Sequence, residues 1–576
     1  MTVILQGVSV CSGCALAPSF LLAQLPDFDL AERAAESVDE TLHRIEAAFR
    51  AVTAELTEEQ AAYTAADASE RAELAGVQLA MLEDSFFRDR ISANADMGLS
   101  AAAAVLSAAK EQEDMLLALN DDYMSARADD IHDLALRVVC SALGLSRPAL
   151  SGLTADCVVV AERLLPSTLM SAKLEHIKGL VIGSGTKTSH VSILASGLQI
   201  PTLVGCGIIS AVKAGETVYL DGEKGVLRCG MSGEELTECR TELAEFQRKQ
   251  QLLAEYGSRP FVSGDGVKSG LYLNITDPCE LLRPMACSCD GVGLFRSEFL
   301  FLDRKTLPSE DEQYEAYAQA AKSLDGRTLT IRTIDIGGDK DAPALGLPKE
   351  ENPFMGYRAV RICMDRSDLI LAQLRAILRA AVCGDVRVMF PMIATVTELE
   401  AMLEYLRQAD AQLTAEHVPH RADVKVGIMV EVPSAVVMLD QLLELVDFVS
   451  IGSNDLVQYT FAADRLNEKV SYLNQFMHPA VLRLLHRTIS LTHERGKECS
   501  LCGEMAGDRV GLAALAILGL RKFSMSSSKL LQAKHLMSLL ELGTLRGLQE
   551  PLLRVRNAEQ AVALLKAALP EEYFGA

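Results

Sequence analysis

The sequence predicts a multidomain α/β protein, in which an α/β domain with an inserted helical bundle is followed by a (β/α)8 TIM-type barrel. Three observations carry this prediction. The chain has 576 residues, which is too long for one ordinary hydrophobic core. Residues 31–145 are rich in Ala, Leu and Glu at helical spacing and contain no proline. In the second half, short apolar runs alternate with helical patterns over about 300 residues.

The composition and charge exclude several classes of function. With 49% hydrophobic and 23% charged residues, the chain has the composition of a soluble globular protein. Its longest apolar run, residues 510–520, is far shorter than the roughly 20 residues that span a bilayer, and no secretion signal marks the N-terminus. We therefore expect a cytoplasmic protein without membrane insertion. The net charge of −23 argues against nucleic-acid binding, which needs clustered Lys and Arg.

The first half of the chain predicts an α/β domain that is interrupted by helices. Short β-rich segments at 157–160, 179–182, 201–204 and 217–220 are bounded by glycines and prolines. Two N-terminal strand-like segments have no sheet of their own, so we expect them to join this one. The helical segment that follows these two strands is acidic over residues 31–100 and could steer a basic partner, although an ordinary solvated face explains the charge equally well.

These patterns divide the chain into four parts. They are residues 1–30 with 146–232 as the α/β domain, 31–145 as the inserted helical subdomain, 233–260 as a charged linker helix, and 261–576 as the barrel.

Eight apolar runs predict the barrel strands. They are residues 270–275, 291–295, 329–334, 386–392, 424–432, 448–451, 498–502 and 522–525. Helical patterns separate most of them. Barrels of this type carry their chemistry at the C-terminal ends of the strands, so polar residues at these ends are the first candidates for a site.

Seven polar residues lie at or just beyond the ends of these runs. They are Arg296, Arg332, Glu431, Asn454, Asp455, Arg465 and Cys502. Three guanidiniums suit a ligand that bears both phosphate and carboxylate, and two carboxylates suit Mg²⁺. Any one of these residues alone would more often form a structural ion pair, but their gathering at one barrel face favours a site. Cys502, with an ordinary thiol pKa, suits a proton donor better than a nucleophile.

His190 is a second candidate centre. A glycine-spaced turn, residues 183–185, precedes it, and an apolar helical stretch follows it, so the imidazole is expected near a helix N-terminus. Free backbone N–H groups there would stabilise a phosphate on the ring, and a neutral imidazole could attack phosphorus. On these local features alone, a histidine that only caps the turn is the more frequent case.

Several long motifs resemble enzyme I of the phosphoenolpyruvate-dependent sugar phosphotransferase system. They occupy residues 291–300, 332–340, 351–358, 431–433, 451–460, 464–465 and 502–506, and residues 122–133 of the helical part resemble the family as well. The motifs stand in the family's order, and the resemblance spans nearly the whole chain.

The resemblance implies a role for each candidate residue. Arg296, Arg332, Arg358, Asn454 and Arg465 would bind phosphoenolpyruvate. Glu431 and Asp455 would hold Mg²⁺, and Cys502 would protonate the enolate to give pyruvate. His190 would carry the phosphoryl group on a swivelling phosphohistidine domain and pass it to the phosphocarrier protein HPr, which would bind the helical subdomain. The resemblance also implies a homodimer that forms through the barrel.

The departures from the family gather around His190. Thr186 and Lys187 replace a glycine and an Arg or Met, Ser196 stands where an arginine is frequent, and Leu169 stands where a threonine is expected. They leave open the rate of phosphohistidine formation and the identity of the acceptor. A paralogue with a dedicated or regulatory acceptor therefore stays an alternative, as does a phosphoenolpyruvate-sensing protein that has lost phosphoryl transfer. ATP-dependent relatives with a swivelling histidine need a large nucleotide-binding domain, for which this chain has no room.

Overall fold

The computed structural model describes twelve segments of the chain. They are residues 2–65, 69–117, 122–150, 152–170, 172–185, 190–198, 200–207, 209–282, 288–302, 306–337, 342–348 and 350–575. They form two compact units, Met1–Arg248 and Lys249–Ala576, and the division falls within one helix, α8 (Gly233–Glu255). Of the helices in the described segments, none has the length and hydropathy that crossing a membrane would need.

The first unit contains an eight-stranded sheet. In chain order its strands are β1 (Val3–Gln6), β2 (Val8–Cys11), β3 (Cys14–Leu21), β4 (Cys157–Ala161), β5 (Ile177–Ile182), β6 (Thr202–Val204), β7 (Thr217–Asp221) and β8 (Val226–Cys229). The spatial order is β1-β8-β7-β3-β4-β5-β6-β2, with a parallel centre from β3 to β6 and antiparallel pairs outside it. The N-terminal strands therefore join the later ones, as expected. The sequence patterns missed β2 and β8.

Five helices lie between β3 and β4 in the chain. They are α1 (Val38–Ala65), α2 (Ser69–Leu82), α3 (Ser85–Asp96), α4 (Ala101–Leu117) and α5 (Asp122–Leu143). They confirm the predicted helical bundle and have a hydrophobic core of their own, in which Phe49 and Leu56 of α1 pack with the buried alanines of α4. Alanine lets neighbouring helices approach closely, which explains the Ala-rich pattern.

A buried carboxylate joins this bundle to the α/β part of the same unit. Asp133 of α5 accepts hydrogen bonds from the hydroxyl and the backbone N–H of Ser167 at 2.8 and 3.2 Å, at the start of α6 (Pro166–Met170). Burial raises the pKa of Asp133, while the bonds from Ser167 and the charge of Arg137 oppose that rise. Short helix α6 packs in turn against α7 (His190–Gly197).

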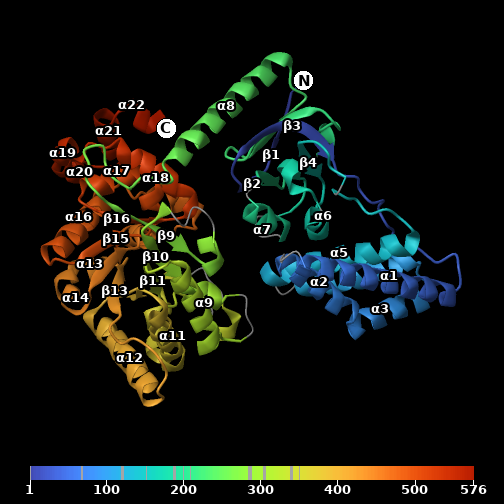
Figure 1. The fold of residues 1–576 in the computed structure, drawn as a ribbon, viewed down its shortest axis with the longest axis horizontal. Coiled ribbons are helices and arrows are strands. Elements are labelled where there is room, and N and C mark those ends of the chain that lie inside the picture. The colour runs from blue at the N-terminus through green and yellow to red at the C-terminus, as the bar shows by residue number, and fades with distance from the viewer. Residues whose placement is uncertain are drawn as a thin grey trace. The chain divides into compact units, whose positions relative to one another are not determined.

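The second unit is a closed barrel of eight parallel strands (Figure 1). They are β9 (Gly270–Ile275), β10 (Gly291–Arg296), β11 (Thr328–Arg332), β12 (Val386–Phe390), β13 (Lys425–Val430), β14 (Phe448–Ile451), β15 (Glu498–Leu501) and β16 (Lys522–Met525). All eight predicted runs are strands, which confirms the (β/α)8 fold. Each strand pairs with its neighbour in sequence, and β16 closes the barrel against β9.

Helices surround the barrel. They are α9 (Glu310–Ser323), α10 (Val360–Asp365), α11 (Ser367–Ala380), α12 (Val396–Ala415), α13 (Pro433–Val437), α14 (Leu439–Leu445), α15 (Ser453–Phe461), α16 (Pro479–Glu494), α17 (Arg509–Ile517), α18 (Leu530–Ser538), α19 (Leu542–Leu545), α20 (Gln549–Arg554), α21 (Ala558–Ala568) and α22 (Glu571–Gly575). Capping boxes at Ser309 and Thr395 begin α9 and α12. Helices α13 and α14 are separated at Met438, whose backbone is close to helical.

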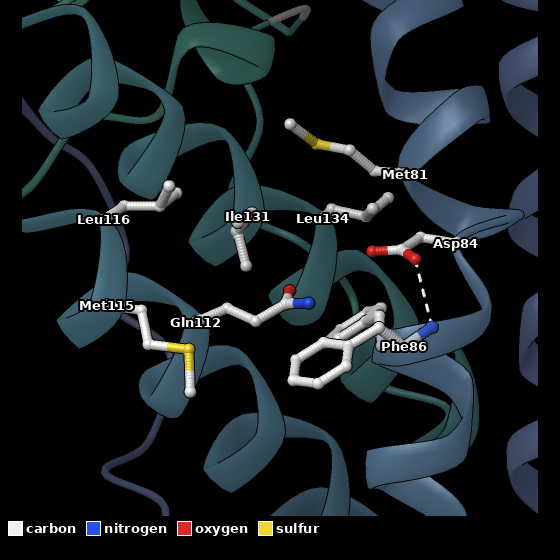
Figure 2. Close-up of a pocket in the computed structure, with 9 residues that line it drawn as sticks. Met81, Asp84, Phe86, Gln112, Met115, Leu116, Ile131 and Leu134 are labelled. Atoms are coloured by element: carbon white, nitrogen blue, oxygen red, sulfur yellow. Dashed lines mark hydrogen bonds between the residues drawn. The ribbon is translucent and has the colours of Figure 1, made fainter.

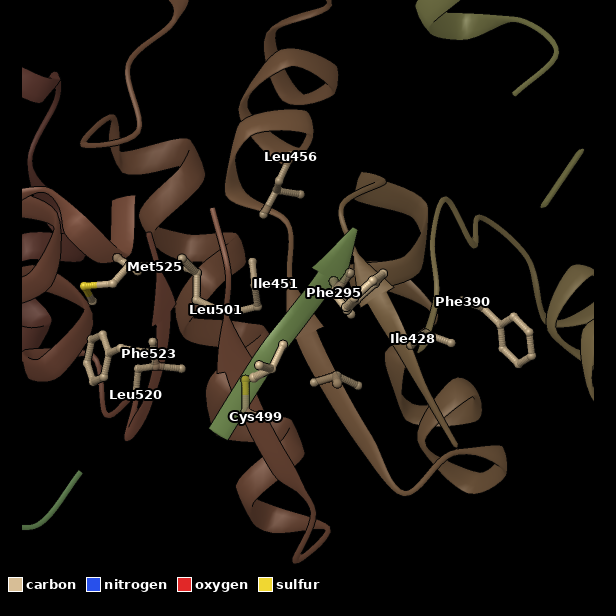
Figure 3. Close-up of a cluster of buried hydrophobic side chains, with 14 of the residues drawn as sticks. Phe295, Phe390, Ile428, Ile451, Leu456, Cys499, Leu501, Leu520, Phe523 and Met525 are labelled. Atoms are coloured by element: carbon tan, nitrogen blue, oxygen red, sulfur yellow. The ribbon is translucent and has the colours of Figure 1, made fainter. Parts of the chain in front are cut away.

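Alternation along the strands separates two sets of buried side chains. Residues such as Phe295, Ile428, Ile451 and Phe523 form the large core between the strands and the helices (Figure 3). The alternate positions form a small second cluster of Leu294, Met389, Met429, Phe448 and Cys502. Because successive strand residues point to opposite faces, the second cluster fills the barrel interior.

Truncation in the larger core should destabilise the second unit. Phe523 is fully buried and packs edge-on against Phe261, with ring centroids 5.6 Å apart. We expect Phe523→Ala to cost about 3–5 kcal/mol of unfolding free energy, because it removes a buried aromatic ring and leaves a cavity. Urea unfolding of the full chain measures this, with Phe299→Ala at a 49% exposed ring as the control. Equal losses in both variants would contradict this assignment of the core.

Candidate active site

The predicted site residues of the second unit meet at the C-terminal end of the barrel. Arg296 and Arg332 are the last residues of β10 and β11, and Glu431 and Cys502 directly follow β13 and β15. The same strand alternation that places Met429 in the barrel interior directs these side chains above it, and Arg332 Nη1 lies 3.6 Å from the Met429 sulfur. Asn454 and Asp455 begin α15, immediately after β14.

A chain of buried ion pairs links five of the charged groups. Arg332 donates to Glu298 Oε1 at 2.5 Å and lies 3.0 Å from Asp335 Oδ2. On its other side, Asp335 Oδ1 accepts from Arg358 Nη2 at 2.9 Å. Arg358 is only 2% exposed, and its Nη2 also lies 3.6 Å from Asp455 Oδ2. Positive and negative groups therefore alternate through this part of the barrel end.

Asp455 and Arg465 extend the same chain toward solvent. Arg465 Nη1 lies 3.4 Å from Asp455 Oδ1, and its guanidinium stands 5.2 Å above the Phe354 ring. Arg465 is half-buried, so one side of it remains accessible. The sequence analysis named Arg332, Arg358, Asp455 and Arg465 of this network but missed Glu298 and Asp335. Each lies within a recognised motif, two or three residues beyond a predicted arginine, and that spacing was the available signal.

Glu431 is a buried carboxyl group close to two other carboxylates. It is 1% exposed, and its Oε1 accepts a hydrogen bond of 2.6 Å from the backbone N–H of Met392. Burial raises its pKa to about 8, with further increases from the negative charges of Asp455 and Asp335, while Arg332 and Arg358 oppose them. A bound cation would relieve this repulsion between carboxylates.

The backbone at Gly452 is adapted to the buried carboxylate. A Cβ atom at this position would lie 2.7 Å from Glu431 Oε2, so any larger residue would displace the carboxylate. In the described segments no group of three or more His, Cys, Asp or Glu residues could hold a metal ion. Glu431 and Asp455 form a pair instead. Mg²⁺ suits such a pair, because it commonly takes one or two protein carboxylates and completes its shell with water and substrate oxygens.

An open cavity of about 660 Å³ adjoins this network. Arg296 and Cys502 line it, together with Asn274 of β9 and Glu504. Asn274 donates a 2.9 Å hydrogen bond to the Cys502 carbonyl, which holds the residue at the cavity wall. Burial raises the pKa of Cys502, so at neutral pH its sulfur keeps its proton and could give it to a neighbouring carbon.

Asn454 connects the cavity wall to α15, the helix that carries Asp455. Its amide donates to Glu504 Oε1 at 3.2 Å, and its amide oxygen accepts from the Glu504 backbone N–H at 3.1 Å. Because Asp455 is the next residue along α15, these bonds tie the loop after β15 to the helix that carries the carboxylate. The cavity and the ionic network are therefore parts of one site.

His190 lies in the first unit. It is the first residue of α7, as the sequence pattern predicts, and its side chain lies outside what the structure describes. Thr186 and Lys187 are also outside the described residues. Ser196 is exposed on α7, and Leu169 is fully buried in the core beside the sheet. The structure therefore brings the seven predicted barrel residues and Arg358 together, and it describes His190 separately.

The helical bundle has an apolar pocket of about 380 Å³ (Figure 2). Side chains of α2 to α5 line it, including Met81, Leu116 and Ile131. Two of its residues are unusually exposed for apolar side chains, Phe86 at 53% and Met115 at 50%. Apolar surface grouped in this way is typical of a binding surface for another protein.

Comparisons with known proteins give a consistent result over the whole chain. Family models match three successive regions. They are the N-terminal region of PEP-utilising enzymes over residues 6–127, their mobile domain over 153–225 and their PEP-binding domain over 250–542. Similar curated proteins are named phosphoenolpyruvate-protein phosphotransferase, in Bacillus sp. (strain S) at 36% identity, and in Staphylococcus carnosus and Bacillus subtilis at 35%. These alignments cover 98% of this chain and 97–99% of the relatives.

The raised pKa of Glu431 predicts a pH-dependent effect of Glu431→Gln on stability. The folded carboxyl titrates at about 8, and the unfolded one at its ordinary value of 4.5. Between these two pKa values the unfolded state releases a proton that the folded state keeps. The free energy of unfolding of the wild type therefore falls, relative to that of the variant, by about 1.4 kcal/mol for each unit of rising pH, and the fall ends above pH 8. Urea unfolding with a chelator at about pH 5, 6.5 and 8 measures it. A difference that stays constant across this range would mean that Glu431 ionises normally.

Proposed function

This chain belongs to the phosphoenolpyruvate-protein phosphotransferase family, and we propose that it transfers the phosphoryl group of phosphoenolpyruvate to its own His190 and then to an HPr-type phosphocarrier protein, thereby driving sugar uptake and phosphorylation. Two observations support the proposal. The family match extends over nearly the full length of the relatives. The barrel end brings Arg296 and the protonated Cys502 thiol to one cavity, beside the buried network of arginines and carboxylates.

The substrate would bind at the end of the barrel. Arg296, Arg332, Arg358 and Arg465 supply planar donors that match phosphate and carboxylate oxygens, and Asn454 adds an amide. Arg332 and Arg358 already pair with protein carboxylates, which holds their guanidiniums in place before the substrate arrives. Glu431 and Asp455 would hold Mg²⁺, which supplies charge neutralisation for the phosphoryl oxygens when it is bound. The pKa of Glu431 is raised first by burial and then by the charge of Asp455, and the second of these effects supports this assignment.

The reaction then needs two steps from the residues of this chain. A ring nitrogen of His190 attacks phosphorus, a new N–P bond forms, and the P–O bond to the enol oxygen breaks. The electrons of that bond leave with the enolate, and its methylene carbon takes the proton of the Cys502 thiol to give pyruvate. The position of His190 at the start of α7 supports its role, because the helix N-terminus favours a phosphate on the ring.

We also propose a role for each of the four parts of the chain. Residues 1–30 with 146–232 would be the swivelling phosphohistidine domain, 31–145 the subdomain that binds HPr, 233–260 the linker helix, and 261–576 the phosphoenolpyruvate-binding barrel. The exposed Phe86 and Met115 beside the bundle pocket support a docking role for the helical subdomain. A homodimer through the barrel and a cytoplasmic location complete the proposal, both by analogy with the family.

Phosphorylation by labelled phosphoenolpyruvate tests the central step. With Mg²⁺ present, we expect the wild-type chain to acquire one acid-labile, base-stable phosphate, because phosphohistidine has that stability. His190→Ala should remove the label completely. His176→Ala, which alters a histidine with a 26% exposed side chain in the same unit, should keep it. Label that survives in His190→Ala would contradict the assignment, and labelled wild type that transfers nothing to purified HPr would favour a dedicated acceptor.

Removal of the thiol tests the proton donor. We expect Cys502→Ala to slow pyruvate formation by roughly 10²-fold or more, because the enolate loses its positioned acid, and to change the KM for phosphoenolpyruvate little. Cys499→Ala is a matched control, since this cysteine is equally buried three residues earlier but belongs to the core outside the barrel. Stopped assays of pyruvate release compare the three proteins. Equal rates in all of them would exclude the thiol as the acid.

A further inference from the structure

Lys529 is a charged residue of the barrel cavity that the proposed reaction leaves without a role. It ends the short 3-10 turn Ser527–Lys529 that follows β16, so it lies at the same barrel end as Arg296 and Cys502. All three residues line the cavity of about 660 Å³. The loop after the last strand therefore adds a cation to a cavity that is also lined by Asn274 of β9, Arg296 of β10 and residues that follow β15.

A glycine in a neighbouring turn makes room for the lysine stem. Gly507 ends the turn Glu504–Gly507, which follows Cys502 closely in the chain. A Cβ atom at Gly507 would lie 3.1 Å from Lys529 Cγ and 3.3 Å from its Cβ. The stem of Lys529 thus packs on the turn that continues from the thiol, and this contact keeps the lysine at the cavity.

Lys529 and Arg296 have no ion-pair partner among the described residues. In the part of the chain that the structure describes, neither side chain forms a hydrogen bond or an ion pair. Glu280, Glu504, Asp508 and Arg509 line the cavity as well. The three carboxylates accept hydrogen bonds from Thr276, Asn454 and Gly511 respectively, and Arg509 donates to the Tyr573 carbonyl. Lys529 and Arg296 are therefore the charged groups of this wall for which the described residues supply no partner, and such cations attract an anion.

The other arginines of the site differ from these two cations. Arg332, Arg358 and Arg465 each lie within ion-pair distance of a protein carboxylate, so part of their charge is already neutralised. A phosphorylated carboxylic acid carries about three negative charges at neutral pH, and one free guanidinium cannot balance them. An ammonium on a flexible stem adds a charge that adjusts to the position of the ligand.

We propose that Lys529 is a further substrate-binding residue, whose ammonium acts with the Arg296 guanidinium to bind the anionic groups of the small phosphorylated carboxylic acid in this cavity. The proposal rests on the proposed function and deepens it. The recognised chemistry is an oxyanion of the substrate, either its carboxylate or its phosphate. In both cases Lys529 acts on affinity more than on the chemical step.

Steady-state kinetics of three variants test this role. We expect Lys529→Ala to raise the KM for phosphoenolpyruvate about tenfold and to leave kcat within about threefold, and Lys529→Arg to restore most of the affinity. Lys322→Ala is the charge-matched control, because Lys322 is an exposed residue at the end of α9, which leads into the opposite end of β11. It should leave both constants unchanged. Inhibition by added pyruvate identifies the group, since pyruvate carries only the carboxylate. A parallel loss of pyruvate affinity indicates the carboxylate, and an unchanged one indicates the phosphate.

Two results would overturn the role of Lys529. One is an unchanged KM in Lys529→Ala, and the other is an equal rise in Lys322→Ala, which would reduce the effect to overall charge. Both require a wild-type chain that is labelled by phosphoenolpyruvate. A wild-type chain that acquires no label at His190 would overturn the proposed function instead, so the two failures are distinguishable.

Discussion

The barrel end depends on the alternation of positive and negative groups around Asp335. This carboxylate lies between two buried arginines, and each arginine contacts a further carboxylate. Burying one of these charges alone would cost several kcal/mol, whereas the chain of pairs compensates each of them. The backbone is adapted to it as well, since a Cβ atom at Gly337 would lie 2.6 Å from the Cβ of Arg358. The network fixes the arginines in position, so little reorganisation is needed when charge develops on a substrate.

The arginines of the site also differ in whether a protein carboxylate contacts them. The arginines inside the network are held and partly neutralised, while Arg296 faces the open cavity without a protein partner among the described residues. Glu431 represents the opposite case, an acidic group whose neighbours include two other carboxylates. The cavity side of the site thus favours an anion, and the carboxylate side favours a cation. The proposed phosphorylated acid and Mg²⁺ would supply both.

Much of this could be predicted from the sequence, because the barrel imposes a simple rule. Each strand is an apolar run, and the polar residue at its end faces the site, which identified Arg296, Arg332, Glu431 and Cys502. The pairing of these residues could not be predicted. Asp335 follows the predicted run 329–334 but lies three residues beyond the observed end of β11. Sequence spacing also does not distinguish an arginine that binds a ligand from one that binds Asp335. The proposed role of Lys529 could not be predicted for a related reason, because closure of β16 against β9 is what brings the loop after the last strand near Asn274 and Arg296.

Helix α8 is held at its two ends by separate sets of contacts. Near its start, Glu235 accepts from Thr2 at 2.5 Å and Glu242 pairs with Arg228 at 3.1 Å. Just beyond its other end, Lys534 donates to the Gly257 carbonyl at 2.9 Å and His535 packs edge-on against Tyr256. Between these contacts, every residue from 243 to 252 is exposed or half-buried, so this stretch depends on its own backbone hydrogen bonds more than on packing. A substitution there would change the stability of α8 mainly through helix propensity.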